Sequence, residues 1–225
     1  MKSSLLKLSQ NLGLNLGLNL GLNLGLKMGL SLLLLTSVTA CSVTQEEPLQ
    51  LSMAPEDRLT LVASGDLSFI QGQASQDGQA FALHPDFELL NVGQEVKPEQ
   101  LKSRMRGAIT AVMQAKGYRQ VLASDSPDLL IGYGVALGDT MSDGEILQKV
   151  GLVPGVSAQG VDMRRFEKGS VLLLVFDPRL MEPSWRVLAQ GFTPLNQDST
   201  LAAQQADERL TRVINKMLSE LPQTP

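Results

Sequence analysis

The sequence predicts an α/β (α+β) domain built as a two-layer sandwich, with a mixed sheet of about four strands and two amphipathic helices on one face. Two observations support this fold class. Strand-like apolar runs and helical apolar stripes follow the order strand, helix, strand, strand, strand, helix. Two helices can cover only one face of such a sheet, so both are expected on the same side.

The first half of the domain predicts one strand and one helix. The strand is expected at residues 59–64, with a continuation through residues 67–70 as an alternative. Residues 71–97 are rich in Gly, Gln and Asp and predict a long excursion that adds little to the core. Pro98 suits the first turn of a helix, and Gly117 suits its end. The apolar stripe of this helix consists of Leu101, Met105, Ala108, Ile109, Val112 and Met113.

The second half predicts three strands and a final helix. The strands are expected at residues 128–137, 169–177 and 184–191, and the last two form an antiparallel hairpin. The helix preceding them is expected to cross over between two parallel strands. The final helix is expected over residues 200–221, with an N-cap at Asp198 or Ser199 and a stop at Pro222. Its stripe consists of Ala206, Leu210, Val213, Ile214, Met217, Leu218 and Leu221.

The amino-terminal residues predict a lipoprotein signal peptide. The first 40 residues contain three lysines and no acidic residue, and residues 28–38 form an apolar run. The run ends in Val38-Thr39-Ala40-Cys41, which fits the bacterial lipobox. Small residues before the cut seat the backbone in the peptidase, and the thiol accepts diacylglycerol. We therefore expect cleavage between Ala40 and Cys41, with lipidation of Cys41, the only cysteine of the chain.

This cleavage site divides the chain into three parts. Residues 1–40 are expected to be removed, residues 41–57 to form a flexible lipidated tether, and residues 58–222 to form a single domain. The repeated Asn-Leu-Gly-Leu pattern at residues 11–26 allows an alternative, an uncleaved membrane helix that self-associates through glycines. Its four asparagines would then lie in lipid, which is costly, so a disposable low-complexity leader is favoured.

Charge and the residue after the cysteine indicate where the protein resides. Beyond residue 40 the chain has 16 basic and 23 acidic residues, a net charge of −7, which disfavours nucleic acid as a partner. Ser42 stands where lipoproteins retained in the inner membrane often carry Asp. The expected location is therefore the periplasmic face of the outer membrane, and the expected contact with the membrane is through acyl chains.

No pattern in the sequence specifies a cofactor or a metal. Residues 132–138 read G-x-G-x-x-x-G after an apolar strand, but an acidic, turn-like segment follows in place of the helix that a dinucleotide fingerprint needs. His84 is the only histidine and stands just before Pro85, so we interpret it as an exposed loop residue. These residues predict neither a nucleophilic triad nor a zinc site.

Acidic residues allow one enzymatic hypothesis. Paired carboxylates could hydrolyse glycans of the cell wall, with Asp125 and Asp128, or Asp139, Asp143 and Glu145, as the nominal candidates. Acidic residues crowd most solvated loops of an acidic protein, so we expect the protein not to be an enzyme.

Residues 138–160 are too long and too apolar for an idle connector. One interpretation is a short helix at residues 146–150 that lies over the sheet, and the other is a mobile flap that meets a partner or an apolar ligand. Trp185 allows a similar choice between a core residue and an exposed anchor. The candidate partner or ligand surface consists of Met141, Ile146, Leu147, Val150, Leu152 and Val153.

An ordered set of short motifs resembles the domain-of-unknown-function 4136 (DUF4136) group of bacterial envelope lipoproteins. The resemblance covers roughly residues 59–222 and implies no reaction, cofactor or catalytic residue. Residues 138–160 depart from the group's usual pattern because they contain no aromatic residue. The motifs are Lys116-Gly117-Tyr118, residues 126–131, residues 166–170, Phe176-Asp177-Pro178 and Ser184-Trp185-Arg186.

Together these features predict a non-catalytic envelope lipoprotein whose domain is a structural or binding module with an envelope protein as its partner. Two alternatives stay open. The first is a carrier that holds an apolar small molecule between the helices and the sheet, and the second is the acid-based cell-wall hydrolase.

Overall fold

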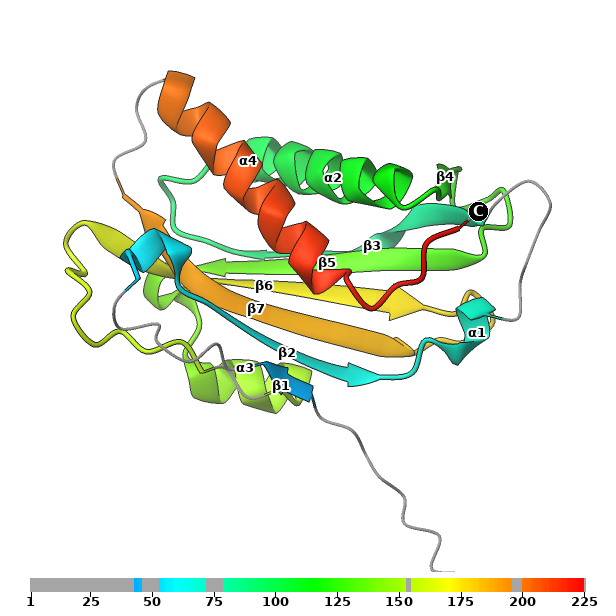
Figure 1. Cartoon of the computed structure of the whole chain (residues 1–225), viewed down its shortest axis with the longest axis horizontal. Coiled ribbons are helices and arrows are strands. Elements are labelled where there is room, and N and C mark those ends of the chain that lie inside the picture. Colours follow the sequence, from blue (N-terminus) through cyan, green and yellow to red (C-terminus); the bar gives the residue numbers. More distant parts are fainter. Residues whose placement is uncertain (1–42, 46–52, 72–78, 153–154, 196–199, 225) are drawn as a thin grey trace, which may run out of the picture. The chain divides into compact units, whose positions relative to one another are not determined.

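The computed structural model describes residues 43–45, 53–71, 79–152, 155–195 and 200–224 (Figure 1). The described residues form a seven-stranded mixed sheet in the order β1-β2-β7-β6-β5-β3-β4. Strand β3 pairs in parallel with β4 and β5, and all other neighbouring strands are antiparallel. The strands are β1 (Val43–Gln45), β2 (Leu59–Gly65), β3 (Ala80–Asn91), β4 (Arg119–Gln120), β5 (Leu129–Leu137), β6 (Phe166–Phe176) and β7 (Trp185–Pro194). The helices are α1 (Ser68–Gln71), α2 (Pro98–Ala115), α3 (Asp143–Val150) and α4 (Thr200–Met217), with 3₁₀ turns η2 (Pro55–Asp57) and η3 (Gly138–Thr140).

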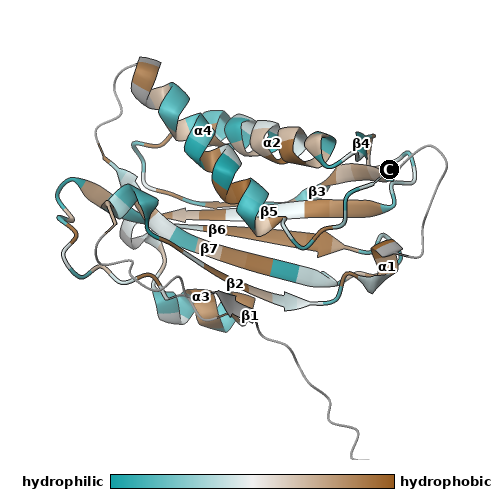
Figure 2. Cartoon of the chain, in the orientation of Figure 1, coloured by the Kyte–Doolittle hydropathy of each residue, from teal (hydrophilic) through white to brown (hydrophobic). Residues whose placement is uncertain are grey.

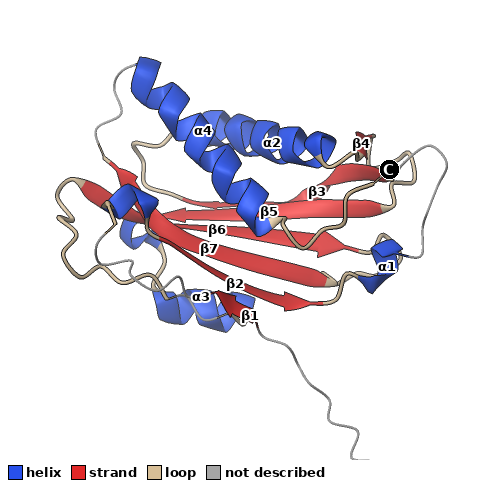
Figure 3. Cartoon of the chain, viewed as in Figure 1, coloured by secondary structure: helices blue, strands red, loops and turns tan. Residues whose placement is uncertain are grey.

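The fold class agrees with the sequence-based prediction, and the number of strands does not. The four predicted strands correspond to β2, β5, β6 and β7, and the predicted helices correspond to α2 and α4, which lie together on one face of the sheet (Figure 3). The prediction of about four strands missed β1, β3 and β4. Two of these three are short edge strands of two or three residues, which leave almost no periodic signal.

Strand β3 is the most informative of these errors, because it lies in the segment predicted to add little to the core. Its first residues are buried, and Phe81 is fully enclosed. The pairing of β3 with β5 shifts register between Leu83 and Glu88, around Pro85. A proline cannot donate to the sheet ladder and is tolerated at such an irregularity. The shift interrupts the alternation of buried and exposed residues that identifies a strand, and the predicted crossover helix α2 follows β3 rather than β2.

The boundaries of the remaining predicted elements are set by particular residues. Strand β2 ends at Gly65 with φ +120°, where a methyl group would lie 2.2 Å from the carbonyl oxygen of Ser184, so it does not continue through residue 70. Helix α2 begins at Pro98 as predicted and is followed by Gly117 with φ +92°. Helix α4 ends at Met217, four residues before the predicted end, and its predicted N-cap lies outside the described residues.

The main core lies between the sheet and helices α2 and α4, where apolar residues concentrate on the strands (Figure 2). Leu173 and Val187 of the central strands face Met105 and Ile109 of α2 in this core. Trp185 is 2% exposed and belongs to the same cluster. It is therefore a core residue and not an exposed anchor.

A second, smaller core lies on the opposite face of the sheet, where the sequence predicted no helix layer. Helix α3 covers part of that face (Figure 1). Its Ile146 packs with Val62 and Leu188 of the sheet and with Leu152. The alternative of a short helix over the sheet in residues 138–160 is thus confirmed, and the arrangement is two-layered only away from α3.

The segment predicted as a flexible tether contains ordered elements. Val43–Gln45 pairs with β2 as an additional edge strand, and η2 precedes β2 directly. Chain segments on both sides of residues 46–52 therefore contact the domain, so the part of the predicted tether that is free to extend is shorter than residues 41–57.

Candidate functional site

The main core is not completely filled at one end of the sheet. A cavity of about 430 Å³ lies between α2, α4, η2 and the adjoining ends of β2, β5, β6 and β7. This volume falls in the range of small-molecule sites, roughly 300–1,000 Å³. Its apolar wall includes Leu59, Met105, Val135, Val171, Leu210 and Val213.

The cavity exists because small residues meet there. Gly169 of β6 is the cross-strand partner of Gly191 of β7, so neither strand contributes a side chain at this register. Ala189 of β7 and Ala206 of α4 also line the cavity, and both are buried. A folded core is normally close-packed, so four small residues around one volume leave space that the longer neighbours do not fill.

Charged side chains surround the apolar wall. Five cations line the cavity, and only two acids do, Glu56 and Asp57 of η2, so the lining carries a net charge of +3. The domain as a whole is acidic, with a net charge of −7 beyond residue 40. The cavity therefore has the opposite sign to the rest of the protein. The cations are Arg58, Arg104, Arg209, Arg212 and Lys216.

These cations differ in what holds them. Arg58 is 5% exposed and donates from Nη1 to the carbonyl oxygen of Gln159 at 2.7 Å. Arg104 pairs with Asp207 of α4. In the described part of the chain, Arg209 and Arg212 have no hydrogen bond or ion pair that would neutralise them. Two guanidinium groups at the cavity are thus available to an anion.

The candidate surface of residues 141–153 is mostly turned inward. Ile146 and Leu152 are each 3% exposed, and Met141 and Val150 pack against them. Leu147 is exposed at 43%, and Val153 lies outside the described residues. The structure brings four of the six residues together as a core cluster, so they present no continuous apolar surface.

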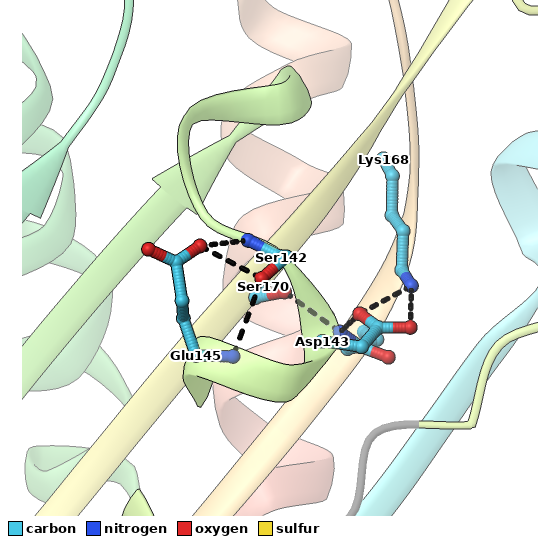
Figure 4. A network of polar contacts seen from close by, with 6 residues as sticks. Ser142, Asp143, Glu145, Lys168 and Ser170 are labelled. Atoms are coloured by element: carbon cyan, nitrogen blue, oxygen red, sulfur yellow. Dashed lines mark hydrogen bonds and ion pairs between the residues drawn. The ribbon is translucent and has the colours of Figure 1, made fainter. Parts of the chain in front are cut away.

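The start of α3 carries two of the carboxylates considered for hydrolysis, and both have structural partners (Figure 4). Glu145 forms a capping box with Ser142, whose backbone N–H donates to the carboxylate at 2.8 Å. Asp143 accepts two hydrogen bonds of 2.6 Å from Lys168 Nζ. Gln190 donates both to Asp143 and to Ser170 Oγ, which joins the helix to strands β6 and β7.

These contacts set the protonation of both acids. Burial opposes ionisation of Asp143, but the hydrogen bonds from Lys168 and Gln190 outweigh it and lower its pKa. The hydrogen bonds from the backbone and side chain of Ser142 lower the pKa of Glu145. Both groups are therefore carboxylates at neutral pH and hold no proton that a general acid could donate.

The other residues singled out in the sequence occupy structural positions. Gly132 and Gly134 lie inside β5, as the interpretation of a glycine-containing strand predicted. His84 was interpreted as an exposed loop residue, which is wrong. It lies in β3, half-buried, with its ring 4.6 Å from that of Phe87 and 4.7 Å from that of Phe176, and burial lowers its pKa.

Several predicted features fall outside what the structure describes or are limited to it. Ala40 and Cys41 lie outside the described residues, so the cleavage and lipidation sites stay predictions. Among the helices that are described, none combines the length and the apolar character needed to cross a membrane. The described residues also contain no cluster of three or more His, Cys, Asp or Glu side chains placed to hold a metal ion.

Sequence reasoning missed the cavity and its cations. A signal for part of it was present, because Arg209, Arg212 and Lys216 follow helical spacing beside the apolar stripe of α4. The small residues of β6, β7 and α4 gave no signal, since their proximity depends on strand register and helix placement. Together, fold and site define a lipoprotein-sized α/β domain with a mixed sheet, a helix pair on one face and a cation-lined apolar cavity beneath that pair.

The chain belongs to the family described as "Domain of unknown function (DUF4136)", which it matches over residues 71–223. This agrees with the resemblance seen in the sequence motifs. Comparison with curated proteins gives no match.

Three solved structures illustrate the similarity of fold. A PelC dodecamer from Paraburkholderia phytofirmans is 15% identical, with a TM-score of 0.39, 73% of this chain covered and 98% of that chain. A DUF4136 family protein from Bacteroides thetaiotaomicron is 14% identical, with a TM-score of 0.41 and coverages of 73% and 96%. Lipoprotein GNA1162 from Neisseria meningitidis is 12% identical, with a TM-score of 0.34 and coverages of 61% and 99%.

Proposed function

We propose that this protein is a lipoprotein of the bacterial cell envelope, anchored through Cys41 at the periplasmic face of the outer membrane, and that its domain is a non-catalytic binding module for an apolar small molecule. The observation that carries the binding role is the cavity of about 430 Å³ beneath α2 and α4. This is the volume in which the sequence analysis placed the ligand of a carrier, between the helices and the sheet.

The anchor is supported by sequence and by the physics of acyl chains. Residues 38–41 fit the lipobox, and Ser42 favours the outer membrane over the inner one. Each buried methylene contributes about 0.8 kcal/mol, so two or more chains hold a protein stably at a bilayer.

Metabolic labelling with an alkyne-bearing palmitate tests the anchor. We expect the full-length protein to incorporate the label and to fractionate with the outer membrane, and the Cys41→Ser variant to lose both properties. Mass spectrometry of the mature protein should find a mass that begins at an acylated Cys41. An intact leader, or a free thiol at that residue, would contradict this part of the proposal.

The cavity supports a small-molecule ligand better than the α3 segment supports a protein partner. Ile146 and Leu152 are buried in the second core, so a partner could reach them only if α3 left the sheet. Binding of an envelope protein elsewhere on the domain stays a prediction, which crosslinking of the lipoprotein in intact cells would test.

We do not propose the hydrolase. A glycosidase needs one carboxylic acid whose pKa is raised so that it can protonate the leaving group. Asp143 and Glu145 have lowered pKa values and hold structural contacts. The side chain of Asp139 lies outside the described residues.

Photocrosslinking tests the binding role on the intact lipoprotein. The probe is a twelve-carbon alcohol with a diazirine in its chain, irradiated with the lipoprotein in phospholipid nanodiscs. We expect crosslinks on cavity residues such as Met53 and Leu210, and a loss of about tenfold in the Ala206→Phe variant, which fills the cavity. Leu201→Phe adds an equal ring at an exposed position of the same helix and should leave the crosslinks unchanged. Labelling confined to the outer surface would contradict the binding role.

A further inference from the structure

We infer that the occupant of the cavity is a single-chain anionic amphiphile, with its acyl chain among the apolar side chains and its acidic head group at Arg209 and Arg212. This inference rests on the proposed function and names the class of ligand that the same site takes. It is carried by the placement of uncompensated cations at the border of an apolar cavity.

The flanks of α4 have different charge. Arg209, Arg212 and Lys216 fall on one side of the apolar stripe that contains Ala206 and Leu210, since positions three, four and seven apart share a helix face. Asp207 lies on the other flank, where it pairs with Arg104 of α2. The side of α4 turned toward α2 is thus neutralised internally, and the opposite side carries cations only.

Arg209 and Arg212 are positioned for an anion that stays close to water. Both line the cavity, Arg209 is half-buried and Arg212 is exposed. A head group at this border would keep part of its hydration, which avoids the large penalty of burying a charge. The planar guanidinium fork matches the two oxygens of a carboxylate or a phosphate.

The remaining walls fit one chain with one small head group. The volume of about 430 Å³ lies near the lower end of the range of ligand sites. Glu56 and Asp57 of η2 also line the cavity, and they would repel additional negative charge along that wall. A singly charged head group on the α4 side satisfies both conditions.

The same crosslinking experiment, with three head groups, tests this inference. The diazirine-bearing twelve-carbon alcohol is compared with the corresponding carboxylate and the corresponding alkyl phosphate, each in the same nanodiscs. We expect both anions, or one of them, to label the cavity more strongly than the alcohol, and this preference to weaken at high salt. A preference for the carboxylate identifies a fatty acid as the source, and a preference for the phosphate identifies a lipid phosphate.

Charge variants assign the preference to α4. In Arg209→Gln/Arg212→Gln we expect the anion-to-alcohol labelling ratio to fall roughly three- to tenfold, the effect of two ion pairs near the surface. The control Arg119→Gln/Arg179→Gln removes the same charge at the other end of the sheet and should leave the ratio unchanged. Because both pairs are at least partly exposed, the variants should fold, which circular dichroism checks.

The outcomes separate this inference from the proposed function. If the alcohol labels the cavity and the labelling ratio is the same in the wild type and the Arg209→Gln/Arg212→Gln variant, the anionic ligand is excluded and the binding module stands. If no probe labels the cavity, the binding module itself is excluded.

Discussion

The two faces of the sheet are covered by helices with opposite results. On one face, α2 and α4, each 18 residues long, pack on the main core and still leave a cavity. On the other face, the eight-residue α3 seals a small cluster around Ile146. The length of a covering helix therefore does not decide whether a face is filled. The side-chain volume at each register decides it, and Gly169 opposite Gly191 leaves the cavity under the longer helices.

Truncating one apolar side chain on each face should give the largest difference. Ile146→Ala removes a side chain that is 3% exposed and leaves a new void, which should destabilise the fold by about 2–4 kcal/mol. Leu210→Ala removes a half-buried side chain beside a cavity that already exists, so we expect a cost of about 1 kcal/mol. Equilibrium unfolding in urea measures both. Equal costs would mean that the cavity is filled by rearrangement of its walls in solution.

Adding carbon atoms to each face should have effects of opposite sign. A methyl group on Gly132, on the α3 side of β5, would lie 2.6 Å from Cβ of Phe87, so Gly132→Ala should destabilise by about 1–3 kcal/mol. Ala189→Val adds two methyl groups toward the cavity and should be neutral or stabilise by up to about 1 kcal/mol. Thermal unfolding of the two variants against the wild type tests the pair. A destabilised Ala189→Val variant would show that the cavity has less free volume than the structure indicates.

What the sequence revealed of these faces depended on whether the pattern was local. The stripes of α2 and α4 and the apolar runs of β5, β6 and β7 repeat within one segment, and they were predicted with nearly correct boundaries. Strand β3 was missed because the irregularity around Pro85 interrupts its alternation. Helix α3 was identified as an alternative from its apolar residues, but not the face of the sheet that it covers.

The candidate site could be predicted less well than the fold. Its cavity depends on residues that are distant in sequence and silent as a pattern, such as Gly191 and Ala206. The lipidation motif at Cys41 is readable because a peptidase recognises a contiguous stretch of chain. A cavity between packed elements has no such contiguous stretch, and only the helical spacing of Arg209, Arg212 and Lys216 hinted at its charge.

The smallest expected effect concerns the polar seal at the start of α3 and depends on pH. Asp143 is held by Lys168 and Gln190, and its pKa in the folded state is lowered from 3.8. The unfolded chain therefore binds a proton more readily, so the stability from this contact is present above pH 3.8 and is lost as the pH falls through the lower, folded pKa. Asp143 is 52% exposed, and solvent screening limits the contribution to about 0.5–1 kcal/mol.

The variant Asp143→Ala isolates this contribution. We expect the difference in the free energy of unfolding between wild type and variant to be constant between about pH 7 and pH 5 and to shrink below about pH 4, since only the wild type carries the titrating group. Arg209→Gln, on the opposite face, serves as a control that should show no such dependence, because the charge it removes does not titrate in this range. A difference that persists undiminished to pH 3 would mean that Asp143 acts through packing or helix propensity. The α3 face would then be sealed by its apolar cluster alone, and the contrast with the open face would rest entirely on side-chain volume.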